Sequence, residues 1–240
     1  MNLIVDIGNT RTKLAVYEGQ KQISFSTFSE LKYDDLGNFL SNLRINRGII
    51  SSVRELPPFV TDLMCNCIPS VHTLSYTSKL PFKIEYETPE TLGTDRIAAI
   101  AGAYNAFYPS DVLVIDAGTA ITYDFLIGTI YTGGNISPGI DMRFRALNNF
   151  TAKLPLLSKS NDFSFPARNT SDAIIAGVIT GVVYEINEYI RTFEKKHKNL
   201  KIIITGGDGS YLKDKILAET IYMPDIVIDG LNYILNYNAK

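Results

Sequence analysis

Two aspartates stand at the same point of two similar segments. Asp6 ends one apolar run and is followed by Gly8, and Asp116 ends another and is followed by Gly118. A carboxylate is costly to bury unless it is paired, hydrogen-bonded or bound to a cation. A glycine turn beside it exposes backbone N–H groups that attract phosphate. One such segment is an ordinary strand-to-turn junction, but two copies predict a cleft that holds a nucleotide and a metal.

A third aspartate, Asp95, opens an alanine-rich stretch that predicts a helix, with Gly93 before it and Arg96 after it. Thr94 or Asp95 at the helix N terminus is most simply explained as a cap, because such side chains accept hydrogen bonds from unpaired backbone N–H groups there. That explanation leaves Arg96 without a role. A carboxylate next to a guanidinium can orient a hydroxyl and hold an anion, so the pair favours a substrate that carries both a hydroxyl and a carboxylate.

Three weaker signals lie in the second half. The glycine-rich residues 133–139 either present backbone to a ligand or simply turn the chain. Gly206 and Gly207 end an apolar run, where a flat ring or a ribose would fit, although a tight turn explains them equally well. Residues 150–169 show little periodicity, and a stretch of that length is typical of loops that cover a site.

Composition excludes several classes of protein. The 240 residues carry a net charge of −2 with a pI near 5.7, and the basic residues are dispersed, so no nucleic-acid partner is expected. The sequence contains no run of 18 apolar residues, so it predicts no membrane span. The first strand follows Met1 almost directly, which leaves no room for a signal peptide, and we expect a cytoplasmic protein.

The cysteines and histidines predict no chemistry. Cys65 and Cys67 form a single Cys-x-Cys pattern, which we interpret as two unrelated buried thiols rather than a metal site. His72 and His197 stand in no recognisable setting. Neither a Ser-His-Asp triad nor a histidine-bound zinc is therefore expected.

The order of predicted elements repeats along the chain. In the first half, strands are predicted at 3–7, 13–17, 22–27, 48–53 and 71–74, with helices at 34–43 and from Pro57, giving the order βββαβαβ. In the second half, a meander is predicted at 112–116, 121–126 and 129–132, followed by helical segments, a strand at 201–205 and a helix at 229–237. The chain is therefore predicted to be α/β, with two ribonuclease-H-like domains, 1–110 and 111–240. Each domain has a mixed sheet, and the two face each other across a nucleotide cleft, as in actin-like ATPases and sugar kinases.

A long helix is predicted from Thr170. Its apolar residues recur at four-residue spacing, and Gly177 and Gly181 lie beside them. Small residues four apart allow another helix to pack closely. Because the apolar positions exceed one stripe, a subunit interface is favoured slightly over an internal contact.

Taken together, these motifs resemble the type III pantothenate kinases. The resemblance runs in order over essentially the whole chain, through residues 6–13, 93–96, 116–122, 133–139, 151–155 and 205–207. It implies an actin-like fold and phosphorylation of pantothenate by ATP, the opening step of coenzyme A synthesis. It also implies a cytoplasmic homodimer that needs a monovalent cation, K⁺ or NH₄⁺, and a divalent metal, Mg²⁺, with ATP. Thr94, where the family more often has alanine, and Ile121, where threonine or serine is common, depart from the pattern without removing a charge or a glycine.

The resemblance also implies roles for individual residues. Asp95 becomes the proton acceptor, and Asp116 binds the monovalent cation. ATP is assigned to Asp6, Gly8, Asn9, Thr10, Lys13 and Thr119. Pantothenate is assigned to Tyr86, Gly93, Thr94, Asp95, Arg96 and Thr170.

Two other functions remain open from the residues. A kinase of the same fold would act on another small hydroxy acid or a sugar, and a panel of substrates would separate it. A non-catalytic accessory factor for transcription would retain the fold without turnover. The three carboxylates at 6, 95 and 116, each beside a glycine turn, argue against the second.

Overall fold

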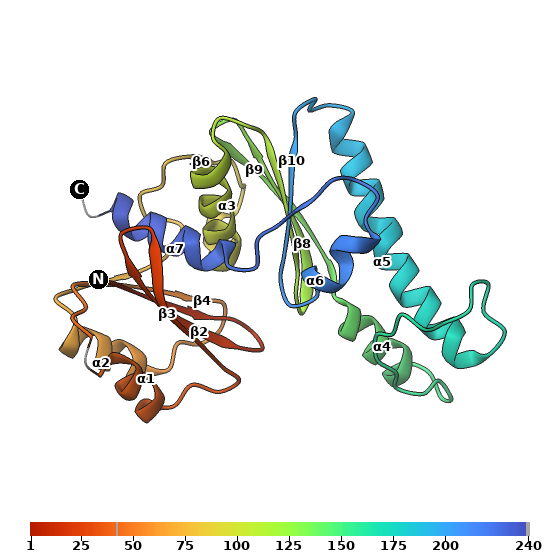
Figure 1. The fold of residues 1–240 in the computed structure, drawn as a ribbon, viewed down its shortest axis with the longest axis horizontal. Coiled ribbons are helices and arrows are strands. Elements are labelled where there is room, and N and C mark those ends of the chain that lie inside the picture. Colours follow the sequence, from red (N-terminus) through yellow and green to blue (C-terminus); the bar gives the residue numbers. More distant parts are fainter. Residues whose placement is uncertain (42, 239–240) are drawn as a thin grey trace. The chain divides into compact units, whose positions relative to one another are not determined.

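The computed structural model describes residues 1–41 and 43–238 (Figure 1). The chain divides into two compact units. Unit 1 comprises Met1–Pro109, Gly128–Thr132 and the residues from Asp225 onward, and unit 2 comprises Ser110–Ile127 and Gly133–Pro224. The sequence predicted two domains, 1–110 and 111–240. The structure differs in assigning the last helix to unit 1, because that helix packs its apolar face on helix α3 and strand β1.

Unit 1 is built on a five-stranded mixed sheet in the order β3-β2-β1-β4-β5. β1 pairs antiparallel with β2 and parallel with β4. The strands are β1 (Asn2–Ile7), β2 (Thr12–Glu18), β3 (Lys21–Phe28), β4 (Arg47–Ser52) and β5 (Ser70–Thr73). All six residues of β1 are buried, as expected for a strand covered on both faces.

Helices cover both faces of this sheet. The helical elements of unit 1 are α1 (Tyr33–Leu40), α2 (Pro58–Cys67), the short 3-10 turn η1 (Pro89–Thr91), α3 (Thr94–Phe107) and α7 (Ile226–Tyr237). One core joins β1, β2 and β4 to Leu36 of α1 and to Val60 and Met64 of α2. On the other side, α3 packs along α7, and both contact β4. The start of α3 is thereby held near the carboxyl end of the central strands.

Unit 2 repeats the central pattern. β7 (Val112–Ala117) pairs antiparallel with β8 (Ala120–Ile127) and parallel with β10 (Lys201–Thr205), and β10 pairs with β11 (Ile221–Tyr222). β9 (Ile130–Pro138) follows β8 in the sheet. Its first residues, in unit 1, pair with β6 (Lys83–Ile84). The strand expected at 129–132 thus continues through the glycine pair to Pro138, with Gly133 at φ 102°.

The helical elements of unit 2 pack on one side of its sheet or follow β10. They are α4 (Ile140–Asn149), α5 (Thr170–Glu194), α6 (Gly209–Leu212) and the 3-10 turn η2 (Lys213–Lys215). Side chains of α5 at four-residue spacing join those of β7 and β8 in one core. α5 is also long and apolar enough to cross a membrane by length and composition. Its apolar stripe instead covers the sheet, as in the core helix of a globular protein.

The two aspartate segments occupy equivalent positions in their sheets. Asp6 lies opposite Lys13 on the antiparallel neighbour and Ser51 on the parallel neighbour. Asp116 lies opposite Thr122 and Thr205 in the same arrangement. The internal repeat and the predicted order βββαβαβ of the first half are confirmed by the structure.

One sequence-based interpretation is wrong. Cys65 and Cys67 are exposed free thiols rather than buried ones. Val60 and Met64, four residues apart, place one stripe of α2 in the core, and the two cysteines fall outside that stripe.

Candidate active site

Asp6 is a nearly buried carboxylate at the end of β1. Its side chain is hydrogen-bonded to Ser51, while its Oδ1 is buried without a hydrogen-bond partner in the described part of the chain. Burial raises the pKa of Asp6 to about 6; Lys13 opposes this shift and the charge of Asp95 adds to it. An oxygen with unused acceptor capacity at the mouth of a sheet suits a ligand that brings a proton donor or a cation.

The turn after Asp6 leaves its backbone accessible. The N–H of Gly8 donates to the carbonyl oxygen of Arg11 at 3.0 Å and closes the turn. Asn9 and Thr10 at its tip are exposed. The segment thus offers polar groups beside a fixed carboxylate, as the sequence predicted.

Helix α3 begins beside this carboxylate. Asp95, in its first turn, accepts a hydrogen bond from the backbone N–H of Arg96 at 2.8 Å. A Cβ at Gly93 would lie 2.5 Å from Asp95 Oδ1, so this glycine gives the carboxylate its room. Thr94 Oγ1 lies 3.1 Å from Ser51 Oγ. Asp95 is therefore an acidic residue in the first turn of α3, and its charge is close enough to raise the pKa of Asp6.

Arg96 and Tyr86 come together as expected for two contacts of one substrate. The guanidinium carbon of Arg96 lies 5.9 Å from the centre of the Tyr86 ring, within the range of a cation–π interaction. Arg96 is only 6% exposed, and burying its charge costs free energy unless the guanidinium is paired. A charged group held this way is a suitable anchor for a substrate anion.

In unit 2, Asp116 and the turn after it are enclosed by two glycine segments. The N–H of Gly118 donates to Ala120 O at 3.0 Å, and the N–H of Gly139 donates to Thr119 O at 3.1 Å. A Cβ at Gly206 would overlap Asp116 Oδ1 and the backbone of the next residue. Both segments that the sequence identified as weak candidates, 133–139 and 206–207, therefore contact the Asp116 turn.

Comparison with known proteins decides what this arrangement is for. A model of the type III pantothenate kinase family matches residues 2–192. A type III pantothenate kinase of Phocaeicola vulgatus is 40% identical over 242 residues and covers 100% of both chains. One of Bacteroides fragilis is 39% identical and covers 99% of this chain and 98% of its own.

The chain belongs to the type III pantothenate kinase family. It transfers a phosphoryl group from ATP to pantothenate in coenzyme A biosynthesis. The family expected from the motifs, the enzyme class and the ATP-dependent reaction are thus confirmed.

Solved structures show the fold. A candidate Baf family transcriptional activator from Campylobacter jejuni has a TM-score of 0.62 and 26% identity, covering 99% of this chain and 98% of its own. A glucokinase from an Antarctic psychrotroph has a TM-score of 0.53 and 11% identity, covering 98% of each chain. The second likeness shows the fold alone, and it is the actin-like fold of sugar kinases that the repeat predicted.

The structure gathers the predicted pantothenate kinase residues in two groups. Unit 1 carries the Asp6 turn, Lys13, Tyr86 and residues 93–96, and unit 2 carries Asp116, Thr119 and Thr170. Thr170 begins α5 beside Asn169, whose side chain accepts a hydrogen bond from the N–H of Asp172 at 2.9 Å. Thr170 therefore stands at the start of a capped helix.

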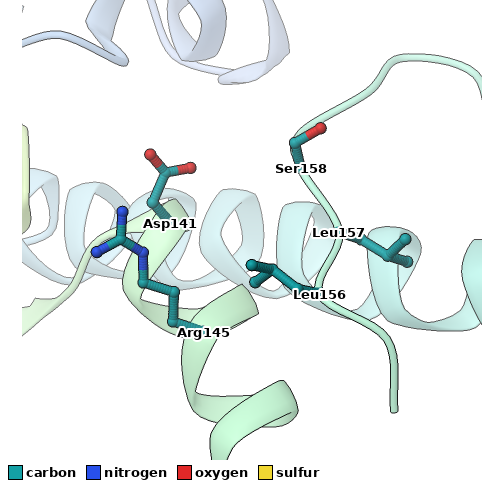
Figure 2. A pocket seen from close by; sticks show the side chains of 5 residues that line it. All are labelled: Asp141, Arg145, Leu156, Leu157 and Ser158. Carbon is teal, nitrogen blue, oxygen red and sulfur yellow. The ribbon is translucent and has the colours of Figure 1, made fainter.

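A pocket of about 380 Å³ lies elsewhere in unit 2 (Figure 2). It is lined by Asp141, Arg145, Leu156, Leu157 and Ser158. Three of these five come from the stretch 150–169 that the sequence analysis expected to cover a site, but none is a predicted site residue.

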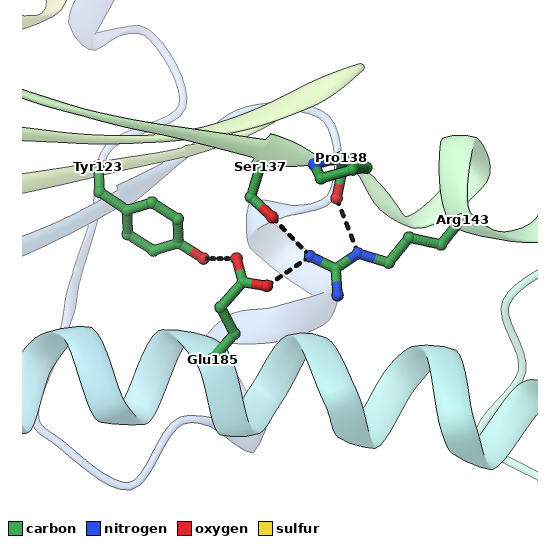
Figure 3. Close-up of polar contacts among 5 residues, drawn as sticks. All are labelled: Tyr123, Ser137, Pro138, Arg143 and Glu185. Carbon is green, nitrogen blue, oxygen red and sulfur yellow. Dashed lines mark hydrogen bonds and ion pairs between the residues drawn. The ribbon is translucent and has the colours of Figure 1, made fainter. Parts of the chain in front are cut away.

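An ion-pair network supports the start of α4 and was not foreseen (Figure 3). Arg143 donates from Nη2 to Ser137 Oγ at 2.7 Å and to Glu185 Oε2 at 2.6 Å, and from Nε to Pro138 O at 2.8 Å. Tyr123 donates to Glu185 Oε1 at 2.7 Å. The network ties α5 to the residues just before Gly139, which contacts the Asp116 turn. Glu185 lies 42 positions from Arg143 and 62 from Tyr123, so no local pattern identifies its part in the network.

Proposed function

We propose that Asp95 accepts the proton of the pantothenate hydroxyl while Arg96 and Tyr86 hold the other end of the molecule. The observation that supports this most is the joint placement of Asp95 beside Asp6 and of Arg96 against Tyr86. Pantothenate carries a primary hydroxyl and a carboxylate, the two groups for which this pair is suited. Gly93, Thr94 and Thr170 complete the proposed contacts.

The phosphates of ATP are assigned to the two turns. Asp6, Gly8, Asn9, Thr10, Lys13 and Thr119 would bind them. Phosphoryl transfer passes through a loose transition state that mainly needs positioning and neutralisation of charge. A strong base is unnecessary, and a carboxylate that orients the hydroxyl and takes its proton late is enough.

Mg²⁺ accompanies ATP and, when bound, neutralises charge on the phosphates. Among the described residues, no three His, Cys, Asp or Glu side chains gather as a metal site. This fits an ion bound mostly by phosphate and water with one or two carboxylates. Asp6, with its buried Oδ1 lacking a hydrogen-bond partner, is a suitable carboxylate.

Asp116 is assigned to the monovalent cation, K⁺ or NH₄⁺. The carboxylate lies at the end of β7, with the backbone at Gly206 close to its Oδ1. Rates of ADP release measured with KCl or NaCl as the added salt test this role. Activation by K⁺ that disappears in Asp116→Asn supports it, and an Asp116→Asn protein with the wild-type K⁺ response rules it out.

The enzyme is further proposed to be a cytoplasmic homodimer without nucleic-acid or membrane partners. Large apolar side chains are exposed on α4, α5 and the stretch between them in unit 2: Met142, Phe150, Leu156, Phe165 and Tyr184. Exposed apolar side chains of this size are candidates for a surface that another protein covers. Sedimentation at several concentrations would detect the dimer.

A further inference from the structure

Two hydroxyl groups connect Asp6 to the first turn of α3. Ser51 is fully buried at the end of β4, opposite Asp6 in the parallel register, and its hydroxyl is hydrogen-bonded to the Asp6 carboxylate. Its Oγ also lies 3.1 Å from Thr94 Oγ1. Thr94 Oγ1 in turn lies 3.2 Å from the carbonyl oxygen of Ser52, to which it donates.

The number of available protons decides which group donates in each of these hydrogen bonds. Each hydroxyl has one proton to donate, so the two hydroxyls supply two protons. Three contacts require a proton: the one between Ser51 and Asp6, the one between Ser51 and Thr94, and the one between Thr94 and the carbonyl oxygen of Ser52. An ionised Asp6 can only accept, so Ser51 donates to Asp6. The single proton of Thr94 is then shared between Ser51 Oγ and Ser52 O. Both hydroxyls are thus ordered by the carboxylate rather than free to rotate.

We propose that Ser51 is a positioning residue, whose hydroxyl, through that of Thr94, joins the Asp6 carboxylate to the start of α3 and so fixes Asp95 relative to the ATP-binding turn. The proposal rests on the roles proposed above for Asp6 and Asp95. Ser51 has no exposed surface, so it acts through its neighbours and not by touching substrate.

The placement matters because this reaction depends on geometry. A misplacement of about 1 Å can lower an enzymatic rate by about a hundredfold. Asp6 lies at the end of a strand held on both sides by its neighbours in the sheet, whereas Asp95 lies in the first turn of a helix, next to Thr94. The hydroxyl pair links the end of β4 to the first turn of α3.

The test compares variants that remove one hydroxyl each. Ser51→Ala and Thr94→Val remove it with little change of shape, and Thr94→Ser retains it. We expect Ser51→Ala and Thr94→Val each to lower kcat at least about tenfold, and Ser51→Ala, at a residue that does not touch substrate, to change KM for pantothenate less. Thr94→Ser should retain most of the rate. Because the two hydroxyls act as one unit, the double variant should lose little more than the worse single variant.

A matched control removes a hydroxyl elsewhere in unit 1. Tyr17 donates to Asp229 at 2.7 Å, and Tyr17→Phe should change stability in urea but leave kcat as in the wild type. ATP affinity measured by calorimetry gives a readout independent of turnover, and we expect Ser51→Ala to weaken it less than it lowers kcat.

The proposal is overturned if Ser51→Ala and Thr94→Val unfold more easily in urea yet keep the wild-type kcat, because the hydroxyls would then be structural only. If one variant does not fold, the other decides. Asp95→Asn in the same assay separates this from the proposed function. Full activity in Asp95→Asn removes the role of Asp95, whereas loss of activity there with wild-type kcat in both hydroxyl variants removes only the positioning role.

Discussion

Gly230 of α7 and Ala98 of α3 lie in direct backbone contact. A methyl group at position 230 would overlap the carbonyl oxygen of Ala98, and Gly102 is similarly close to the backbone of Ile226. Glycines at both crossing points allow the two helices to pack at backbone distance. Because Asp95 lies in the first turn of α3, this contact also holds the proposed proton acceptor in place.

Replacing Gly230 by alanine should therefore destabilise the protein. Overpacking in a rigid contact costs about 1–3 kcal/mol, and we expect Gly230→Ala to lower the free energy of unfolding in urea by that amount. Gly37→Ala is the matched control, since Gly37 lies in α1 with nothing within 4 Å of its Cβ position. It should gain up to about 1 kcal/mol from helix propensity. Equal effects of the two changes would contradict the packing argument.

Asp6 should destabilise the ligand-free protein above pH 6. Folding raises the pKa of Asp6 from 3.8 to about 6. The folded protein therefore binds the proton of the Asp6 carboxyl group more tightly than the unfolded chain does. The free energy of unfolding should therefore fall as pH rises between about 4 and 6. Asp6→Asn removes this contribution, and at pH 7.5 it should be more stable than the wild type by about 2–3 kcal/mol.

Urea unfolding of both proteins at pH 4 and pH 7.5, without ATP or Mg²⁺, measures this difference. The gain in Asp6→Asn should be present at pH 7.5 and small at pH 4. A gain of the same size at both pH values would mean that the ionisation of Asp6 is not its cause.

Glu185 should stabilise the enzyme at neutral pH. Burial alone would raise the pKa of its carboxyl group, but hydrogen bonds from Arg143 and Tyr123 outweigh burial and hold that pKa below 4.5. Glu185→Gln should lower the free energy of unfolding at pH 7 by about 1–3 kcal/mol. The difference from the wild type should shrink in acid, as pH falls through the lowered pKa of Glu185, because the wild-type carboxylate then becomes protonated.

The control for Glu185 lies on the same helix. Glu188 pairs with Arg191 at an exposed position, with both side chains more than half exposed. Exposed ion pairs contribute little because water screens them, so Glu188→Gln should leave the unfolding curve unchanged. Calorimetric or urea unfolding that ranks the two variants the other way would contradict the account of the network in Figure 3.

The sequence was sufficient where chemistry and local pattern coincide. Asp6 and Asp116 each end a buried run and precede a glycine, and the structure places them equivalently in two sheets. Asp95 and Arg96 were predicted at a helix start for the same reason, since caps and glycines are local signals. These residues include the aspartates to which catalysis and cation binding are assigned.

The sequence was insufficient where the contact is between distant residues. Ser51 gains its role only because β4 pairs in parallel with β1, and Glu185 meets Arg143 42 positions away. The placement of α7 in unit 1 likewise depends on the match between Gly230 and Ala98. Tertiary packing determines such pairs, although two hydroxyls at the end of a predicted parallel strand were a signal that could have identified Ser51.

The central claim is that Asp95 accepts the proton of pantothenate, and ADP release from ATP upon addition of pantothenate tests it most directly. Wild type and Asp95→Asn are compared in KCl, with Asp62→Asn on the exposed face of α2 as a control for the same chemical change. We predict that Asp95→Asn keeps its thermal unfolding profile and loses at least about a hundredfold in turnover, while Asp62→Asn keeps the wild-type rate. A folded Asp95→Asn protein that turns over at the wild-type rate would contradict the claim.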